Sequence, residues 1–226
     1  KYLDNIQNKK IILYFHNDPL SMNGSKSTND RIYLLNNIDK ILFNSEWSQE
    51  RFFIGIENKK LLKQKTSVCY QSTNRTKVKF SQKKKLISFI GKLNSAKGYD
   101  IFGKTIIKIL NKYRDWKAIV IGDEPREKLF FRHRNLKVYG YVKHDKVLNL
   151  LKKVSISVVC SRWEEPFGRT SLEAASRGSA VIISNRGGLP ETSSKSIILK
   201  KLTYESIFNE VKKLILNPRK LKEIQK

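Results

Sequence analysis

Short runs of β-branched and aliphatic residues alternate with helix-like stretches along most of this chain. The runs in the second part are LISFI (86–90), WKAIVIG (116–122), NLKVYG (135–140), VSISVVC (154–160) and AVIIS (180–184). Amphipathic stretches such as KGYDIFGKTIIKILNKY (97–113) separate them. Strands that alternate with helices pair in parallel and are covered on both faces. The pattern therefore predicts an α/β fold with a Rossmann-like, doubly wound parallel sheet of five strands, whose ligands collect at the carboxyl ends of the strands.

The first part of the chain shows the same alternation on a smaller scale. IILYF (11–15), KILFN (40–44) and TSVCY (66–70) are predicted strands, and Ser45 is placed to cap a helix that Gly55 ends. The polar, lysine-rich segment 72–85 then interrupts the pattern. We interpret it as a linker, which divides the chain into a Rossmann-like domain over residues 1–75 and a second one over residues 76–226.

The charge of the chain limits its possible partners. Its 226 residues include 46 Lys and Arg against 20 Asp and Glu, which gives a formal net charge of +26. Such a charge attracts nucleic acids or anionic membrane surfaces. A nucleic-acid binder is expected to show a basic stripe interleaved with aromatic residues or a recognised module, and neither occurs in this sequence. An anionic membrane surface is the better candidate for any surplus charge.

The cysteines and the apolar runs indicate a compartment. Cys69 and Cys160 each lie in an apolar, strand-like run, and no CxxC pair or His cluster points to a metal. We therefore expect both to be buried thiols in a reducing compartment. No run approaches 18 apolar residues and no signal peptide is visible. The expected location is cytoplasmic, with peripheral binding at the inner face of the membrane as a further option.

The segment SRWEEPFGRTSLE (161–173) carries the chemistry. It sets Glu165 and Glu173 eight residues apart, between a predicted strand and a helix expected to start at Gly168. A helix start offers unpaired N–H groups, so Glu165 and the amides of Phe167 and Gly168 would face a ligand there. The carboxylate of Glu173 would point to the same crevice and accept hydrogen bonds from a ribose diol. Two glutamates at this spacing are more often a polar helix start with one surface residue, so the interpretation depends on neighbouring motifs.

Four such motifs follow one another along the chain. They are FIGKLNSAKG (89–98), VIGDEP (120–125), VYGYV (138–142) and RGGLPET (186–192). Together with Glu165 and Glu173 they resemble the retaining glycosyltransferases of family 4, whose C-terminal domain carries a Glu-x7-Glu motif. The resemblance implies the GT-B type, in which two Rossmann-like domains flank the crevice for the nucleotide-sugar donor. It also implies a longer enzyme, of which this chain would hold a truncated N-terminal domain and most of the C-terminal one.

The resemblance assigns the diphosphate of the donor to the turn after the strand at 86–90. Lys92 and Lys97 flank this turn, and Gly91 and Gly98 allow close backbone approach to a ligand. The family usually has Arg at the first basic position. A lysine there is a point charge without the bidentate fork of arginine, so we expect charge stabilisation with looser geometry. Two exposed lysines in so basic a chain would mean little without this placement.

Other motifs supply the remaining site residues that the resemblance implies. Gly187 and Gly188 match a Gly-Gly-x-Pro-Glu loop that brings backbone N–H groups onto a phosphate. Tyr141 stands where family members meet the nucleobase, and His16 ends a strand where a histidine lies beside donor sugar and acceptor. A lone histidine is otherwise structural or solvated. Glu124 departs from the family, which has the second glycine of a Gly-x-Gly pair at this position.

The function implied is transfer of a sugar, with retention at the anomeric carbon, from a nucleoside diphosphate sugar to a hydroxyl of a glycan or a lipid-linked acceptor. Lys92, Lys97, Glu165 and His16 would serve the reaction, chiefly through electrostatics and positioning. The sequence contains no Asp-x-Asp, so we expect neither a metal nor another cofactor. Two alternatives stay open: a nucleotide-binding remnant without turnover, and a basic nucleic-acid-binding protein.

Overall fold

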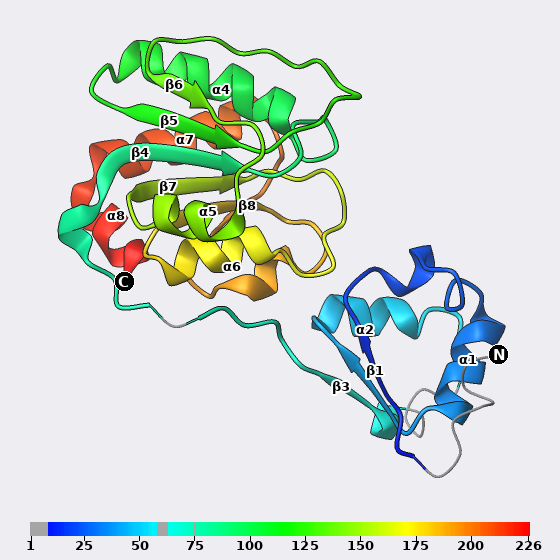
Figure 1. Ribbon diagram of the computed structural model, residues 1–226. Helices are drawn as coiled ribbons and strands as arrows, with labels where there is room; N and C mark the ends of the chain where they lie inside the picture. The colour runs from blue at the N-terminus through cyan, green and yellow to red at the C-terminus, as the bar shows by residue number, and fades with distance from the viewer. Residues whose placement is uncertain (1–8, 58–62, 75) are drawn as a thin grey trace. The chain divides into compact units, whose positions relative to one another are not determined.

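The computed structural model describes residues 9–57, 63–74 and 76–226 (Figure 1). By internal contacts the chain divides into two compact units. The first comprises residues 1–71 and 165–167, and the second comprises residues 72–164 and 168–226. The main division between the two units therefore falls after Gln71, a few residues before the boundary expected from the lysine-rich segment. Residue 75, the predicted end of the first domain, lies outside the described residues.

The first unit contains a three-stranded parallel sheet in the order β1-β2-β3. Its elements are β1 (Ile12–Phe15), α1 (Thr28–Asn37), β2 (Lys40–Phe43), α2 (Glu46–Phe52) and β3 (Thr66–Val68). Ser45 caps α2 as predicted, because its hydroxyl accepts a hydrogen bond from the Ser48 amide. Phe15, Phe43 and Phe52 pack together with ring centroids 5.2–5.5 Å apart, and they form the centre of the unit's core.

The second unit is built on a six-stranded parallel sheet in the order β6-β5-β4-β7-β8-β9 (Figure 1). The strands are β4 (Lys84–Ile90), β5 (Lys117–Ile121), β6 (Leu136–Val138), β7 (Val154–Val159), β8 (Ala180–Ser184) and β9 (Ile197–Leu199). All pairs are parallel. The predicted α/β class with a doubly wound, Rossmann-like sheet is confirmed, and its central strands β4 and β7 are those that the sequence shows as continuous apolar runs.

Helices cover both faces of this sheet. They are α4 (Tyr99–Lys112), α5 (His144–Leu151), α6 (Arg169–Ser176), α7 (Tyr204–Leu216) and α8 (Pro218–Gln225). Successive strand side chains point to opposite faces. Ala118 and Val120 of β5 accordingly join the cluster under α4 and α7, whereas Ile119 and Ile121 join the cluster under α5 and α6. The alternation within one buried strand thus supplies two separate cores.

The structure adds a strand that the sequence analysis did not predict. β9 is only three residues long and extends the sheet from five strands to six. Serines and lysines flank it on both sides, so its apolar run is too short to stand out. β9 exists because its residues pair with β8, with Ile182 opposite Ile197 and Ser184 opposite Leu199. Pairing with β8, rather than the local sequence, therefore determines this strand.

The segment EPREKLFF (124–131) forms an irregular loop rather than a helix. Their side chains are engaged elsewhere. Phe131 packs edge-on against Tyr99 with ring centroids 5.4 Å apart, and it lies over Gly103 of α4, where a Cβ atom would come within 2.1 Å of the Phe131 ring. Packing against α4 therefore replaces a helix in this segment.

Residues 204–225 form two helices, α7 and α8, which are divided at Asn217. Thr203 caps α7, which ends at Leu216, and Asn217 caps a new helix, α8, by accepting a hydrogen bond of 2.9 Å from the Lys220 amide. Pro218 favours this arrangement because it lacks an amide proton and is well tolerated at the first position of a helix. Gln225 then anchors α8 beneath the sheet by donating to the Ser155 carbonyl.

Candidate functional site

The order of the strands identifies the ligand-binding end of the sheet. The chain leaves β4 toward β5 on one side and leaves β7 toward β8 on the other, so the winding reverses between β4 and β7. In open α/β sheets, ligands bind beyond the carboxyl ends of the strands at this point. Predicted site residues follow these ends: Gly91, Lys92 and Lys97 after β4, Tyr141 after β6, Gly168 and Glu173 after β7, and Gly187 and Gly188 after β8. The fold brings them to one edge.

Three neighbouring strands end in glycines that permit close backbone contact. The Gly91 amide donates to the Ile121 carbonyl at 3.0 Å, and the Gly122 amide donates to the Gly140 carbonyl at 2.9 Å. Gly122 has φ of 141°, and a Cβ atom there would lie 1.8 Å from the Gly91 oxygen. Only glycine fits at this position. The loops after β4, β5 and β6 are therefore joined at their starting points.

The loop carrying the two lysines is also fixed at its far end. Gly98, with φ of 76°, precedes α4, and a Cβ atom there would lie 2.0 Å from the Cys160 carbonyl oxygen at the end of β7. The Arg162 amide donates to the Ala96 carbonyl at 2.8 Å. The loop over residues 91–98 therefore rests directly on the end of β7, at the point where the winding reverses. Lys92 is exposed on it and Lys97 is half-buried.

Glu124 holds the same loop through its side chain. Its carboxylate is 4% exposed, binds Arg126 at 2.6 and 2.9 Å, and accepts a hydrogen bond of 3.1 Å from the Asn94 amide group. Asn94 in turn accepts a hydrogen bond of 2.9 Å from the Lys97 backbone amide. Hydrogen bonds from Arg126, with a smaller contribution from Asn94, lower the pKa of Glu124 to about 2. Glu124, which stands where the family has glycine, thus holds the loop together with Arg126 and Asn94. We call this group of three side chains the brace.

A second carboxylate supports this brace. Glu127 accepts hydrogen bonds from the Ser95 amide at 2.9 Å and from its hydroxyl at 2.6 Å. In the sequence, Glu124 stands out only because it replaces the family's glycine, and neither Glu127 nor Asn94 has a predicted role. Nothing in the sequence links residue 94 to residues 124 and 127, because their contact depends on the adjacency of β4 and β5.

Gly168 and Glu173 lie on α6 as predicted. Gly168 caps the helix with φ of 111°, and a Cβ atom there would lie 2.4 Å from a Leu189 methyl carbon. Glu173 is buried, and its Oε1 accepts hydrogen bonds from Arg169 at 3.2 Å and from His144 at 3.0 Å. Both use Oε1; among the described residues, none donates to Oε2. One carboxylate oxygen is therefore held in place by two side chains.

The partners of Glu173 differ in how visible they are in the sequence. Arg169 precedes Glu173 by four residues, the spacing at which helix side chains meet. His144 comes from the start of α5, 29 residues away in sequence, and the sequence analysis missed it. A ring nitrogen of His144 reaches the carboxylate only because α5 and α6 lie side by side on one face of the sheet.

The glycine loop after β8 already holds an anionic group. The Gly187 amide donates to Glu164 Oε2 at 2.5 Å, and Arg186 contacts Glu164 Oε1 at 2.9 Å. Gly187 has φ of 56°, which suits glycine, and Gly188 follows it at the start of a short turn. The predicted phosphate-binding amide of Gly187 therefore binds a carboxylate in this structure. A phosphate would have to displace Glu164 to use it.

The remaining predicted residues group differently. Residues 165–167, which include Glu165 and Phe167, belong by their contacts to the first unit, and Phe167 is buried with its ring 6.0 Å from that of Tyr70. His16 directly follows β1 of the first unit, where its Nδ1 lies 2.8 Å from the Gln71 side-chain nitrogen. Tyr141 is 82% exposed after Gly140 in the second unit. The roles assigned to these residues stay predictions.

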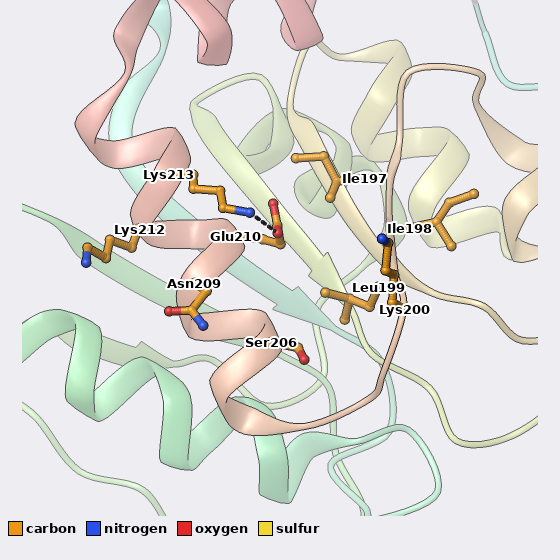
Figure 2. A pocket seen from close by; sticks show the side chains of 9 residues that line it. All are labelled: Ile197, Ile198, Leu199, Lys200, Ser206, Asn209, Glu210, Lys212 and Lys213. Atoms are coloured by element: carbon orange, nitrogen blue, oxygen red, sulfur yellow. Dashed lines mark hydrogen bonds and ion pairs between the residues drawn. The ribbon is translucent and has the colours of Figure 1, made fainter.

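A large hollow elsewhere in the second unit does not match the site. It has a volume of about 500 Å³ and lies between β9 and α7, lined in part by Ile197, Ser206 and Asn209 (Figure 2). Glu210 and Lys213 in this hollow pair with each other at 2.7 Å. β9 is the outer strand, two places from β7 in the sheet, so the hollow is separated from the residues that follow β4.

One cysteine differs from its prediction. Cys160 is buried at the end of β7, and burial raises the pKa of its thiol to about 12. Cys69 is exposed, so the expectation of a buried thiol is wrong there. It follows β3, an outer strand of the smaller sheet, where its amide continues the pairing by donating to the Phe43 carbonyl at 2.8 Å. An apolar run at the border of a sheet can have one uncovered side.

Within residues 9–57, 63–74 and 76–226, no helix has both the length and the apolar character needed to cross a membrane. Within the same ranges, no three His, Cys, Asp or Glu residues gather as metal ligands would.

The fold and the edge described above define a class of protein. Two Rossmann-like units are the architecture of GT-B glycosyltransferases, and solved structures share it. Anabaena HepE in complex with UDP matches with a TM-score of 0.79 at 16% identity, over 96% of this chain and 65% of that one. A glycosyltransferase from Rickettsia africae matches with a TM-score of 0.75 at 20% identity, over 96% and 64%. Identities this low support the fold alone.

Sequence comparison adds the family. Residues 71–226 match the glycosyl transferases group 1, and the chain belongs to this family. The GPI3 subunit of phosphatidylinositol N-acetylglucosaminyltransferase from Saccharomyces cerevisiae is 33% identical over 126 residues, which are 53% of this chain and 28% of the relative. The 2-deoxystreptamine N-acetyl-D-glucosaminyltransferase of Niallia circulans is 29% identical over 126 residues, 52% of this chain and 32% of the relative. The matched region thus spans about a third or less of these relatives.

Proposed function

We propose that the second unit binds a nucleoside diphosphate sugar at the carboxyl ends of β4 and β7. We further propose that the protein transfers the sugar to a hydroxyl acceptor with retention at the anomeric carbon. One observation carries the proposal: a buried carboxylate, Glu173, and a braced loop with two lysines occur at the same edge of one sheet. HepE, a structural neighbour, has been solved with UDP and with UDP-glucose, which supports a nucleotide-sugar donor.

The chemistry follows from charge. As the glycosidic bond to the diphosphate breaks, negative charge grows on the leaving oxygen, and preorganised cations nearby lower the barrier. Lys92 and Lys97 would supply this charge from a loop whose backbone is already held by Asn94. Glu173 would accept hydrogen bonds from the ribose, with Oε2 as the available oxygen. Glu165 and the amides of Phe167 and Gly168 would bind hydroxyls of the donor sugar, and His16 would lie beside the acceptor.

Metal independence is part of the proposal. It rests on the lysines as the source of positive charge and on the lack of an Asp-x-Asp sequence. With Mg²⁺-dependent transfer, EDTA would abolish turnover and added Mg²⁺ or Mn²⁺ would restore it. We expect the enzyme to transfer sugar at an unchanged rate in EDTA, and loss of turnover in the chelator would contradict this point.

The proposed acceptor class rests on a relative and on the charge of the chain. The yeast relative is named for transfer to phosphatidylinositol, which supports a lipid-linked or glycan hydroxyl. The net charge of +26 supports attachment to an anionic membrane surface, and hence a cytoplasmic protein that works at the inner face of the membrane. Assembly of cell-envelope glycan or glycolipid is the biological role that fits this combination.

A binding screen tests the donor proposal. We expect calorimetry of the protein with UDP-, GDP- and ADP-sugars to show one preferred base, followed by release of the matching nucleoside diphosphate in the presence of acceptor extracts. Binding without release on a full-length chain would favour the nucleotide-binding remnant. Affinity for duplex or single-stranded nucleic acid that falls steeply with salt, with no response to any nucleotide sugar, would favour the nucleic-acid-binding alternative.

A further inference from the structure

A small basic hollow lies at the opposite end of the second unit's sheet from the candidate donor site. It has a volume of about 180 Å³ and is lined by Thr76, Lys77, Val78, Lys79, Gln82, Lys152 and Arg177. Lys152 lies just before β7 and Arg177 just before β8, while residues 76–82 run toward the start of β4. These are the amino ends of the strands. We call this feature the linker hollow.

Arg177 is the central observation. The residue is 3% exposed, and the Nε of its guanidinium is buried without a hydrogen-bond partner. Its other contacts use one terminal nitrogen, which donates to Ser176 Oγ at 2.7 Å, Thr73 Oγ1 at 3.2 Å and the Glu173 carbonyl at 3.5 Å. Among the described residues, no carboxylate pairs with this guanidinium. A buried charge without a counter-ion is unfavourable, so the site lacks an anion.

Arg31 in the first unit is a buried arginine whose terminal nitrogens are satisfied without an anion. Both of its terminal nitrogens donate, to the carbonyls of Ser25, Lys26 and Ile54 at 2.6–3.2 Å and to the Thr28 hydroxyl at 3.3 Å. Its Nε, like that of Arg177, is buried without a partner, so only its two terminal nitrogens are satisfied. Arg177 has one such carbonyl and otherwise faces hydroxyls and the linker hollow. The two residues differ at the second terminal nitrogen, which donates twice in Arg31 and, among the described residues, makes no hydrogen bond in Arg177.

The charge around the linker hollow is strongly positive. Lys77, Lys79, Lys152 and Arg177 supply four cations, and no acidic side chain is among the lining residues. Lys152 and Arg177 follow the last turns of α5 and α6, and each of these two helix ends carries roughly half a negative charge in total. Capping of these helix ends explains the position of Arg177. It does not explain Lys77 and Lys79, which come from the linker, and four cations outweigh about one negative charge.

The volume restricts the ligand. Small-molecule sites commonly measure about 300–1,000 Å³, and one water takes about 30 Å³. The linker hollow is therefore too small for a nucleotide sugar and large enough for a tetrahedral oxyanion with some water. Guanidinium and ammonium groups match the oxygens of phosphate in charge and hydrogen-bonding geometry.

We propose that the linker hollow binds a phosphate group, which completes the hydrogen bonding of Arg177 and ties residues 76–82 to the ends of α5 and α6. The site is distinct from the diphosphate position beside Lys92 and Lys97, because it lies at the other end of the strands. The phosphate site can therefore be tested independently of the proposed transferase activity. The phosphate group can belong to free phosphate or to a lipid headgroup.

Inorganic phosphate is the first probe. Calorimetry at constant ionic strength, with chloride as the reference anion, should show a phosphate site that remains when the donor site is saturated with UDP. The double variant Lys77→Gln/Lys152→Gln should weaken it at least tenfold, and Arg177→Gln should do so if it folds. The matched double variant Lys220→Gln/Lys222→Gln, with two exposed lysines on α8, should change it less than twofold. Hydrogen exchange of residues 76–82 should slow with phosphate in the native protein only.

Two results would overturn the proposal. One is phosphate binding that is no stronger than chloride binding at equal ionic strength. The other is a phosphate site abolished by Lys92→Gln/Lys97→Gln and kept in Lys77→Gln/Lys152→Gln, which would place the only anion site at the donor end. Vesicles of phosphatidylcholine with and without phosphatidic acid separate the two sources. Binding that depends on phosphatidic acid and on Lys77 and Lys152 identifies a headgroup, and indifference to the vesicles identifies a free anion.

Discussion

Glu173 shows how one residue can be prepared for a ligand before the ligand arrives. Arg169 and His144 hold Oε1, so the carboxylate is oriented in a buried position. We expect Glu173→Ala to weaken nucleoside diphosphate binding by about 1.5–3 kcal/mol, the scale of hydrogen bonds to a charged group. Calorimetry with the preferred diphosphate measures this, with Glu223→Ala on the surface of α8 as the control. Equal affinity in both folded variants would make Glu173 a structural residue.

Lys83 is a residue whose environment the sequence did not reveal. It belongs to the lysine-rich segment 72–85, interpreted as a linker, yet its Nζ donates to the carbonyls of Leu151 and Val154 at 3.1 and 2.6 Å. Burial lowers the pKa of Lys83 to about 7 from 10.5. Above pH 7 the folded protein loses this proton while the unfolded chain keeps it up to about pH 10.5, so the contribution of Lys83 to stability rises with pH across that window.

The measurement is a comparison of variants. In the native protein, Lys83 should add up to about 1.4 kcal/mol of unfolding free energy per pH unit between pH 7.5 and 9.5. Lys83→Met should remove this slope, whereas Lys84→Met at the exposed neighbouring position should retain it. Denaturant titrations at several pH values give the difference, in which the ionisation of other groups cancels. Parallel stability curves for the two variants would contradict the depressed pKa.

At the scale of elements, the loop between β4 and α4 owes its shape to the loop after β5. Glu124 and Glu127 reach Asn94 and Ser95, and the pKa of Glu124 near 2 keeps this brace ionised at any pH where the protein works. We expect Glu124→Ala to lower kcat/KM about tenfold and to accelerate hydrogen exchange over residues 92–98, because the lysines lose their fixed backbone. Glu223→Ala should alter neither measurement. Unchanged exchange in Glu124→Ala would show that the loop holds its own shape.

The elements also show why sequence reasoning succeeds in some places and fails in others. β4, β5, β7 and β8 contain runs of β-branched and aliphatic residues, and Ser45 and Gly168 mark helix starts through local chemistry, so the sequence predicts them directly. β9 exists through pairing with β8, and the segment at 124–131 is held in a loop by contacts with α4 and the β4 loop. These depend on residues far away in sequence. The same holds for the contact of His144 with Glu173, whereas Arg169 is visible at helical spacing.

At the scale of the whole molecule, basicity and catalysis must be separated, because a chain with a net charge of +26 attracts any anion. If Lys92 and Lys97 neutralise the departing diphosphate, their effect is largest in the transition state. Each replacement by Gln should then lower kcat about 100-fold or more, with a smaller rise in KM. Lys220→Gln and Lys222→Gln remove the same charge from the exposed surface of α8 and should leave kcat unchanged. Steady-state kinetics of the four variants with the preferred donor distinguish stabilisation of the leaving diphosphate from a general effect of positive charge. Small and equal effects at all four positions would mean that the positive charge acts diffusely and that the β4 loop is not the leaving-group site.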